Sequence, residues 1–137
     1  MKRTILLALL LTCGAAWASE WVSVGQPGDK TSENFVDVSS IRRSGDIARA
    51  WIKLVLLPHT QRGAGTDSGK WIEKLVQREA YNCSEGSAKM EAIRTDYEDG
   101  TSWQDSPESM ARQTWEPVPP DTVGEAIMKF VCSWKPK

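Results

Sequence analysis

Two cysteines place the strongest constraint on how this chain can fold. Once an N-terminal export signal is removed, only Cys83 and Cys132 remain. Exported chains meet an oxidising compartment in which thiols pair, so we expect one intramolecular disulfide. It would close a loop of about 50 residues, which the chain-entropy model values at roughly 4 kcal/mol. A metal site and two free thiols are the alternatives, but structural zinc needs four ligands and His59 is far from both cysteines in the sequence.

The first 18 residues, MKRTILLALLLTCGAAWA, have the pattern of a secretory signal peptide. A basic Lys-Arg pair precedes a short leucine-rich run, and Ala16-Trp17-Ala18 is a small-x-small cleavage site. The apolar run is too short to span a bilayer, which argues against a membrane anchor helix. We therefore predict cleavage between Ala18 and Ser19, no transmembrane segment, and one domain over residues 19–137.

Cys13 leaves a second mode of export open. A bacterial lipoprotein signal places a cysteine after a short leucine-rich run, and the segment LLTCG resembles such a site. Thr12 precedes this cysteine, where Gly, Ala or Ser is usual, so free export is favoured over a lipid anchor at Cys13. Both modes predict an exported protein of a Gram-negative bacterium, in the periplasm or on the outer surface.

The size and charge of the mature chain narrow the class of partner. Removal of 18 residues from 137 leaves 119, which fits one domain. The signal contains two of the 17 basic residues and no acidic ones, so 15 basic and 18 acidic residues remain, a formal charge of −3. Nucleic-acid-binding proteins usually carry a strong basic excess, and no nucleic-acid partner is expected here.

Alternating hydrophobicity predicts an antiparallel sheet of about six strands. The clearest strand is IARAWIKLVL, residues 47–56, which has one wholly apolar face made of Ala48, Ala50, Ile52, Leu54 and Leu56. Further strands are expected at 21–24, 34–38, 71–83, 88–97 and 102–105. Strict alternation in 71–83 places Ile72 with Val76 and Ala80, opposite Leu75 and Tyr81. Residues 39–46 are expected to be a tight connection, and residues 106–113 an irregular one.

The segment WEPVPPDTVGEAIMKFVC, residues 115–132, predicts a C-terminal helix. Thr122 and Glu125 fit a capping box, and apolar residues recur behind them every three or four positions. The prolines before this cap fix the entry path and are not expected to pair in a strand. A helix of about three turns is marginal alone in water, so it must pack on the sheet. Pairing of Cys132 with Cys83 would hold the last turn of this helix on the sheet. The expected strands and helix together predict the α+β fold class.

The other face of strand 47–56 contains the best candidate binding group, Trp51 between Arg49 and Lys53. A tryptophan flanked by cations on a partly wet face can form a ligand patch by stacking or cation–π contact. The alternative, which we favour, is that the aliphatic stems of Arg49 and Lys53 simply cover the ring.

No catalytic apparatus, metal set or cofactor site is expected. His59 has no nucleophile motif beside it and fits a surface turn. The acidic group Asp96, Glu98 and Asp99 lacks the spacing of a calcium loop and fits a solvated hairpin tip. The glycine-rich run 63–70 departs from the phosphate-loop pattern and leads into a strand, so it fits a loop.

Four segments of the mature chain, within residues 20–132, form a recognisable set: EWVSVG, FVDVSSIRRSGDIARAWIKL, YNC and WEPVPPDTVGEAIMKFVC. Together they resemble the surface-adhesin protein E family of small exported bacterial domains. The resemblance implies an antiparallel sheet packed by a C-terminal helix that a disulfide ties down, and the binding of host proteins at the bacterial surface. The matching motifs are structural, so the resemblance assigns no binding residue.

Three hypotheses of function follow, in order of preference. The first is a non-catalytic binding module of the bacterial envelope, adhesin-like, whose partners are host extracellular proteins. The second is a periplasmic accessory or assembly factor that contacts another envelope protein through a sheet edge or the Trp51 face. The third is a small hydrolase, which ranks last because no nucleophile–base pair or metal set is present. A homodimer is a further option.

Overall fold

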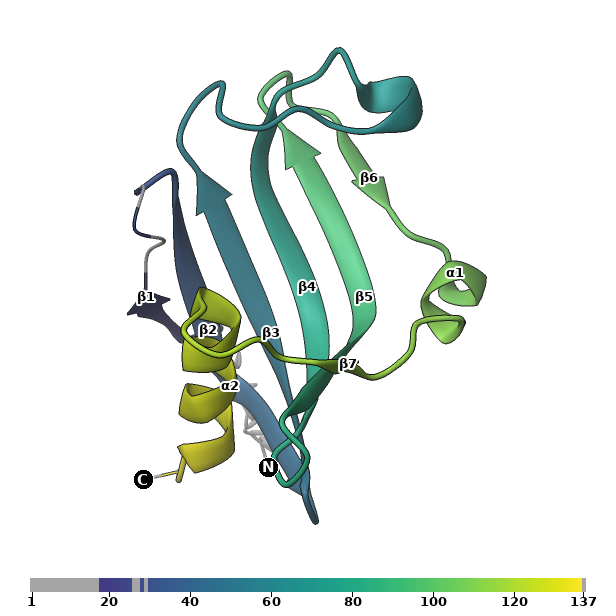
Figure 1. The fold of residues 1–137 in the computed structure, drawn as a ribbon. Helices are drawn as coiled ribbons and strands as arrows, with labels where there is room; N and C mark the ends of the chain where they lie inside the picture. Colours follow the sequence, from purple (N-terminus) through teal and green to yellow (C-terminus); the bar gives the residue numbers. More distant parts are fainter. Residues whose placement is uncertain (1–17, 26–27, 29, 137) are drawn as a thin grey trace, which may run out of the picture.

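The computed structural model describes residues 18–25, 28 and 30–136. It is a seven-stranded antiparallel sheet with a C-terminal helix packed on one face (Figure 1). The strands pair in the order β1-β2-β3-β4-β5-β6, and β7 also pairs with β5. The bounds are β1 Trp21–Gly25, β2 Ser32–Ser44, β3 Ile47–Leu56, β4 Ile72–Asn82, β5 Ser87–Tyr97, β6 Ser102–Gln104, β7 Glu116–Pro117, α1 Pro107–Ala111, α2 Val123–Ser133 and the 3-10 turn η1 Gly65–Asp67.

The predicted fold class is confirmed. The signal-peptide residues 1–17 and the potential lipid site at Cys13 lie outside the described residues. Cleavage between Ala18 and Ser19 therefore stays a prediction, as does the domain division at that point.

The core forms on the predicted apolar face of β3. Ala48, Ala50 and Ile52 are at most 2% exposed, and they pack with Ile127 and Val131 of α2. Two small alanines let the helix approach the sheet closely, so the helix buries its apolar stripe on β1–β4. A second apolar cluster lies further along the same face, beneath the long β3–β4 loop; its members are Leu54, Leu56, Ile72, Leu75 and Tyr97.

The predicted disulfide joins Cys83 to Cys132. Cys83 directly follows β4, a central strand, and Cys132 lies in the last turn of α2. The Cα atoms are 5.8 Å apart and the loop spans 49 residues. Arg43 of β2 adds a second tie at the same place, since its Nη1 donates to the carbonyl of Cys132 at 2.6 Å.

The N-terminus of α2 has half of the predicted capping box. The Thr122 hydroxyl accepts from the Glu125 N–H at 3.2 Å, as expected. The Glu125 carboxylate, however, accepts from the N–H of Asp121 at 3.0 Å rather than from that of Thr122. Asp121 has φ of +58°, and this left-handed residue turns its N–H toward the first helical turn.

Two register shifts overturn details of the sequence prediction. Residues 39–44 are not a connection: β2 continues to Ser44 past an irregularity between Asp37 and Arg42. The Ser40 hydroxyl accepts from the Trp51 N–H at 2.9 Å there and replaces a lost ladder bond. A second shift between Ile72 and Lys74 moves Ile72 to the face of Leu75, so its predicted place beside Val76 is wrong.

The segment between β6 and α2 is more regular than predicted. Ser106 caps the short helix α1 by accepting from the Ser109 N–H at 3.2 Å, and this buries Met110 beside β5. Pro117 does pair in a strand, opposite Ser87 of β5. A proline is tolerated there because β7 is an edge strand whose proline need not donate to a ladder.

Candidate binding surface

The sheet face opposite α2 contains the predicted candidate group. Arg49, Trp51 and Lys53 alternate with the buried residues of β3, so they point away from the helix. Within the described residues, α2 lies wholly on the other side, because its apolar side chains belong to the opposite core cluster. We call this surface, centred on Trp51 and lined by Arg42, Arg49 and Arg78, the Trp51 face.

A hollow of about 240 Å³ opens beside the Trp51 ring, and its polar lining is Ser40, Arg42, Arg49 and Arg78. Arg49 and Arg78 share one carboxylate: their Nε atoms lie 2.9 and 3.1 Å from the two oxygens of Glu91. Arg42 donates to the main-chain carbonyls of Ser39 and Ile41 and has no carboxylate partner in the described part of the chain. The hollow is therefore lined by three arginines and by no acidic residue among those described, and Glu91 pairs with two of them, so the lining carries a net positive charge.

Lys53 belongs to a neighbouring aromatic group. Its ammonium lies 4.4 Å from the ring centroid of Trp21 and 4.9 Å from that of Phe35. These are cation–π contacts across β1, β2 and β3. The structure thus brings Arg49 and Trp51 into one hollow and places Lys53 against other rings, so the predicted trio is split.

Asp37 of β2 is directly opposite Trp51 and forms no ion pair with the arginines of the Trp51 face within the described residues. The residue is only 6% exposed. Its Oδ1 accepts from the N–H groups of Glu20 and Ser39, at 3.0 and 3.1 Å, and from the Ser39 hydroxyl at 2.5 Å. This carboxylate therefore fixes the irregular stretch of β2 that shapes the hollow.

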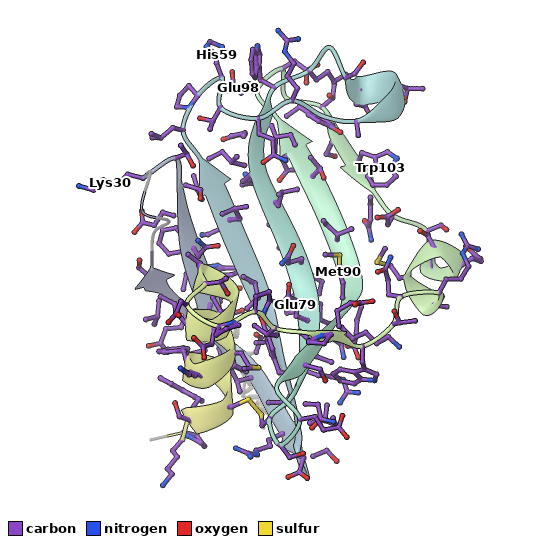
Figure 2. The ribbon with its side chains drawn as sticks, viewed as in Figure 1. Lys30, His59, Glu79, Met90, Glu98 and Trp103 are labelled. Atoms are coloured by element: carbon purple, nitrogen blue, oxygen red, sulfur yellow. A yellow bond between two sulfur atoms is a disulfide. The ribbon has the colours of Figure 1, made fainter. Side chains whose placement is uncertain are left out.

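The residues considered for catalysis or metal binding are engaged in surface pairs. Nε2 of His59 lies 3.0 Å from Glu98, whose other oxygen accepts from the His59 main-chain N–H at 2.8 Å (Figure 2). Asp96 pairs with Arg94 at 2.8 Å, and Asp99 lies 4.0 Å from Lys70. Among residues that the structure describes, no three His, Cys, Asp or Glu side chains gather to hold a metal.

A partly buried polar cluster on the α2 side, around the buried Tyr81, was not predicted from the sequence. The Tyr81 hydroxyl and the Gln77 amide donate to the two oxygens of Glu79. Burial raises the pKa of Glu79, and burial together with the Glu79 charge raises the pKa of Tyr81. Figure 2 shows Glu79 and Met90 at mid-sheet on this side. The sequence does contain a signal for this cluster, which is the spacing of its residues. Residues 75, 77, 79 and 81 alternate along a strand and therefore share one face.

Comparison with known proteins places the chain in a family. The sequence profile of the surface-adhesin protein E family matches residues 21–133, and the chain belongs to this family. The chain is therefore adhesin-like by class, and the four matching segments predicted this membership.

Structural comparison finds a resemblance to the crystal structure of protein E from non-typeable Haemophilus influenzae. The two chains are 15% identical with a TM-score of 0.47, over 85% of this chain and 86% of the other. No curated protein matches the chain. Within residues 18–25, 28 and 30–136, no helix has the length and apolar character needed to cross a membrane.

Proposed function

We propose that this chain is a non-catalytic protein-binding module of the bacterial envelope, adhesin-like, and that it binds through the Trp51 face. The observation that carries the proposal is the hollow beside Trp51, which Arg42, Arg49 and Arg78 line and in which Glu91 pairs with only two of these arginines. Tryptophan and arginine are the residue types most enriched at the energetic centres of protein interfaces. Membership of a surface-adhesin family supports a binding role.

The charge of this surface indicates the chemistry of the partner. The mature chain is expected to be acidic overall, with 15 basic and 18 acidic residues, yet the hollow concentrates arginine. Guanidinium groups form bidentate bonds with carboxylates, and local charge complementarity steers association. The partner is therefore an acidic segment of an extracellular host protein, bound with a carboxylate in the hollow and an apolar group on Trp51.

Capture from host serum tests this function. The exported chain, immobilised, is incubated with serum in low salt, and the retained proteins are identified by mass spectrometry. We expect Trp51→Ala to lose at least about tenfold of the retained partner, the effect of removing a hot-spot side chain. Trp115→Ala is the matched control, because Trp115 is 41% exposed and does not line the hollow.

The dependence of capture on salt concentration is a second readout of this experiment. Binding that depends on exposed arginines weakens as ionic strength rises, because exposed charges are screened over about 10 Å at 0.1 M salt. Equal capture by wild type and a folded Trp51→Ala variant contradicts the proposal, as does capture that salt leaves unchanged.

A periplasmic accessory factor is the second candidate, and an open sheet edge favours it. β1 pairs with β2 only over Asn34–Asp37, so the outer side of β2 from Ser39 to Ser44 has no strand beside it in the described part of the chain. Such an edge can accept a strand from another envelope protein or from a second copy of the chain. Protease treatment of intact cells separates the candidates: a surface adhesin is degraded, and a periplasmic factor is spared.

A further inference from the structure

A second cavity, of about 450 Å³, lies on the α2 side of the sheet, far along the strands from α2 itself. Residues 61–67 of the β3–β4 loop form one wall, and Ile72, Thr95, Tyr97 and Trp103 form the floor. Its volume is within the range of about 300–1,000 Å³ that is usual for small-molecule sites. Figure 2 shows Trp103 at the edge of the sheet, on β6.

The loop wall is held in place before any ligand arrives. Gly63 packs so closely that a Cβ there would lie 2.6 Å from the Asp67 carbonyl and 3.0 Å from the Tyr97 ring. The Gly63 N–H donates to the Lys70 carbonyl at 2.9 Å, and the Lys70 ammonium lies 3.0 Å from the Asp67 carboxylate. Arg62 stacks on the Trp71 ring at 4.0 Å. The cavity is therefore preorganised, which limits the entropy lost on binding.

Thr95 and Trp103 give the cavity its chemistry. They are directly opposed on β5 and β6, so the hydroxyl and the indole stand side by side on one face. Thr95 is 6% exposed, and its hydroxyl makes no hydrogen bond within the described residues. Trp103 is 47% exposed, although tryptophan is usually well covered. The site thus presents an open aromatic platform beside a hydroxyl that no side chain or main-chain group of the described residues engages.

We propose that this cavity binds a neutral pyranose ring, one sugar unit of a glycan. The C–H face of the sugar stacks on Trp103, and one ring hydroxyl bonds with the Thr95 hydroxyl. The Gln61 amide and the main chain of residues 63–66 are available for the other hydroxyls.

The charge and polarity of the cavity favour a neutral sugar over an ion or an apolar side chain. Asp67 and Asp99 are balanced by Lys70 and Arg62, so the cavity rim does not favour an ion of either sign. An apolar side chain from a protein partner would leave the Thr95 hydroxyl buried and unpaired, which is unfavourable. The site lies on the opposite face from Trp51, and the inference does not rest on the proposed function.

Nuclear magnetic resonance with free sugars tests the inference. The ¹⁵N-labelled exported chain is titrated with glucose, galactose, mannose and N-acetylglucosamine, each into the high millimolar range. We expect at least one sugar to shift the Trp103 indole N–H and the Thr95 amide with saturation. N-acetyl-leucine amide is the apolar probe, and we expect no saturable shift from it.

Variants make the test specific. Trp103→Ala is expected to abolish saturation, and Thr95→Val to weaken affinity roughly tenfold, whereas Thr95→Ser retains the hydroxyl and stays within about twofold. Trp115→Ala and Trp51→Ala are expected to bind sugar like wild type, which keeps this result independent of the Trp51 face. The inference is overturned if none of the four sugars saturates, if a folded Trp103→Ala binds unchanged, or if only the apolar probe binds.

Discussion

The two faces of β3 differ in what they do, although their residues alternate along one strand. Ala48, Ala50 and Ile52 are at most 2% exposed and pack against α2. Arg49 and Trp51 are only partly buried and line a cationic hollow. A strand with a period of two can thus support the core with one set of side chains and present a binding surface with the other. The comparison predicts that changes on one face affect stability and changes on the other affect binding.

Loss of the disulfide should have the largest effect on the helix-covered face. Replacing Cys83 and Cys132 by serine removes a bond that closes a loop of 49 residues. We expect the free energy of unfolding to fall by about 4 kcal/mol, because the unfolded chain gains loop entropy. Urea unfolding of the oxidised protein and of the double variant measures this. A difference below about 1 kcal/mol would show that packing alone holds α2 on the sheet.

Neighbouring residues of β3 provide the sharpest test of the two-face comparison. Ile52→Ala leaves a cavity under α2 and should cost about 3 kcal/mol of folding free energy. Trp51→Ala, one residue away, should cost less than half as much, because its side chain is outside the core cluster. Thermal and urea unfolding of both variants measure the pair. Equal losses would mean that Trp51 is a core residue.

The cap of α2 should make a smaller contribution. Thr122→Ala removes the hydroxyl that accepts from the Glu125 N–H, which should cost about 1 kcal/mol. Thr122→Ser keeps this acceptor and is the control. An Ala variant as stable as the Ser variant, by urea unfolding, would show that the Asp121–Glu125 bond suffices as a cap.

The protonation of Glu79 should make the smallest of these contributions to the free energy of unfolding, and this contribution should depend on pH. Burial raises the pKa of Glu79 above its ordinary 4.5, so the folded state holds this proton more tightly than the unfolded state. The contribution to stability is therefore full below pH 4.5, falls as pH rises toward the raised pKa, and stays low above it.

Substitution isolates this contribution. Glu79→Gln should remove that part of the pH dependence and raise stability near neutral pH, in urea unfolding between about pH 4 and 8. The exposed Glu73→Gln on the same strand is the control. An unchanged pH profile in Glu79→Gln would contradict the assignment.

The features of the fold that could be predicted from the sequence are those set by residues close together in the chain or by the expected compartment. The β3 alternation, the Thr122 cap and the Cys83–Cys132 bond all follow from short patterns and the expected compartment. The face on which Ile72 lies could not be predicted, because the register shift beside this residue breaks the alternation.

The cavity under the β3–β4 loop was out of reach for a different reason. It depends on contacts between residues 61–67 and 95–103, which tertiary pairing alone brings together. The alternation of β3 placed Arg49 and Trp51 on one face, but the hollow itself was not predicted, because Arg42 and Arg78 come from the neighbouring strands.

The most direct test of the central claim is the dissociation constant of the serum partner for wild type and for Trp51→Ala, measured by calorimetry on folded protein. We expect at least about tenfold weaker binding by Trp51→Ala, with Trp115→Ala equal to wild type. Equal constants for wild type and Trp51→Ala would contradict the claim that this adhesin-like protein binds through the face opposite its helix.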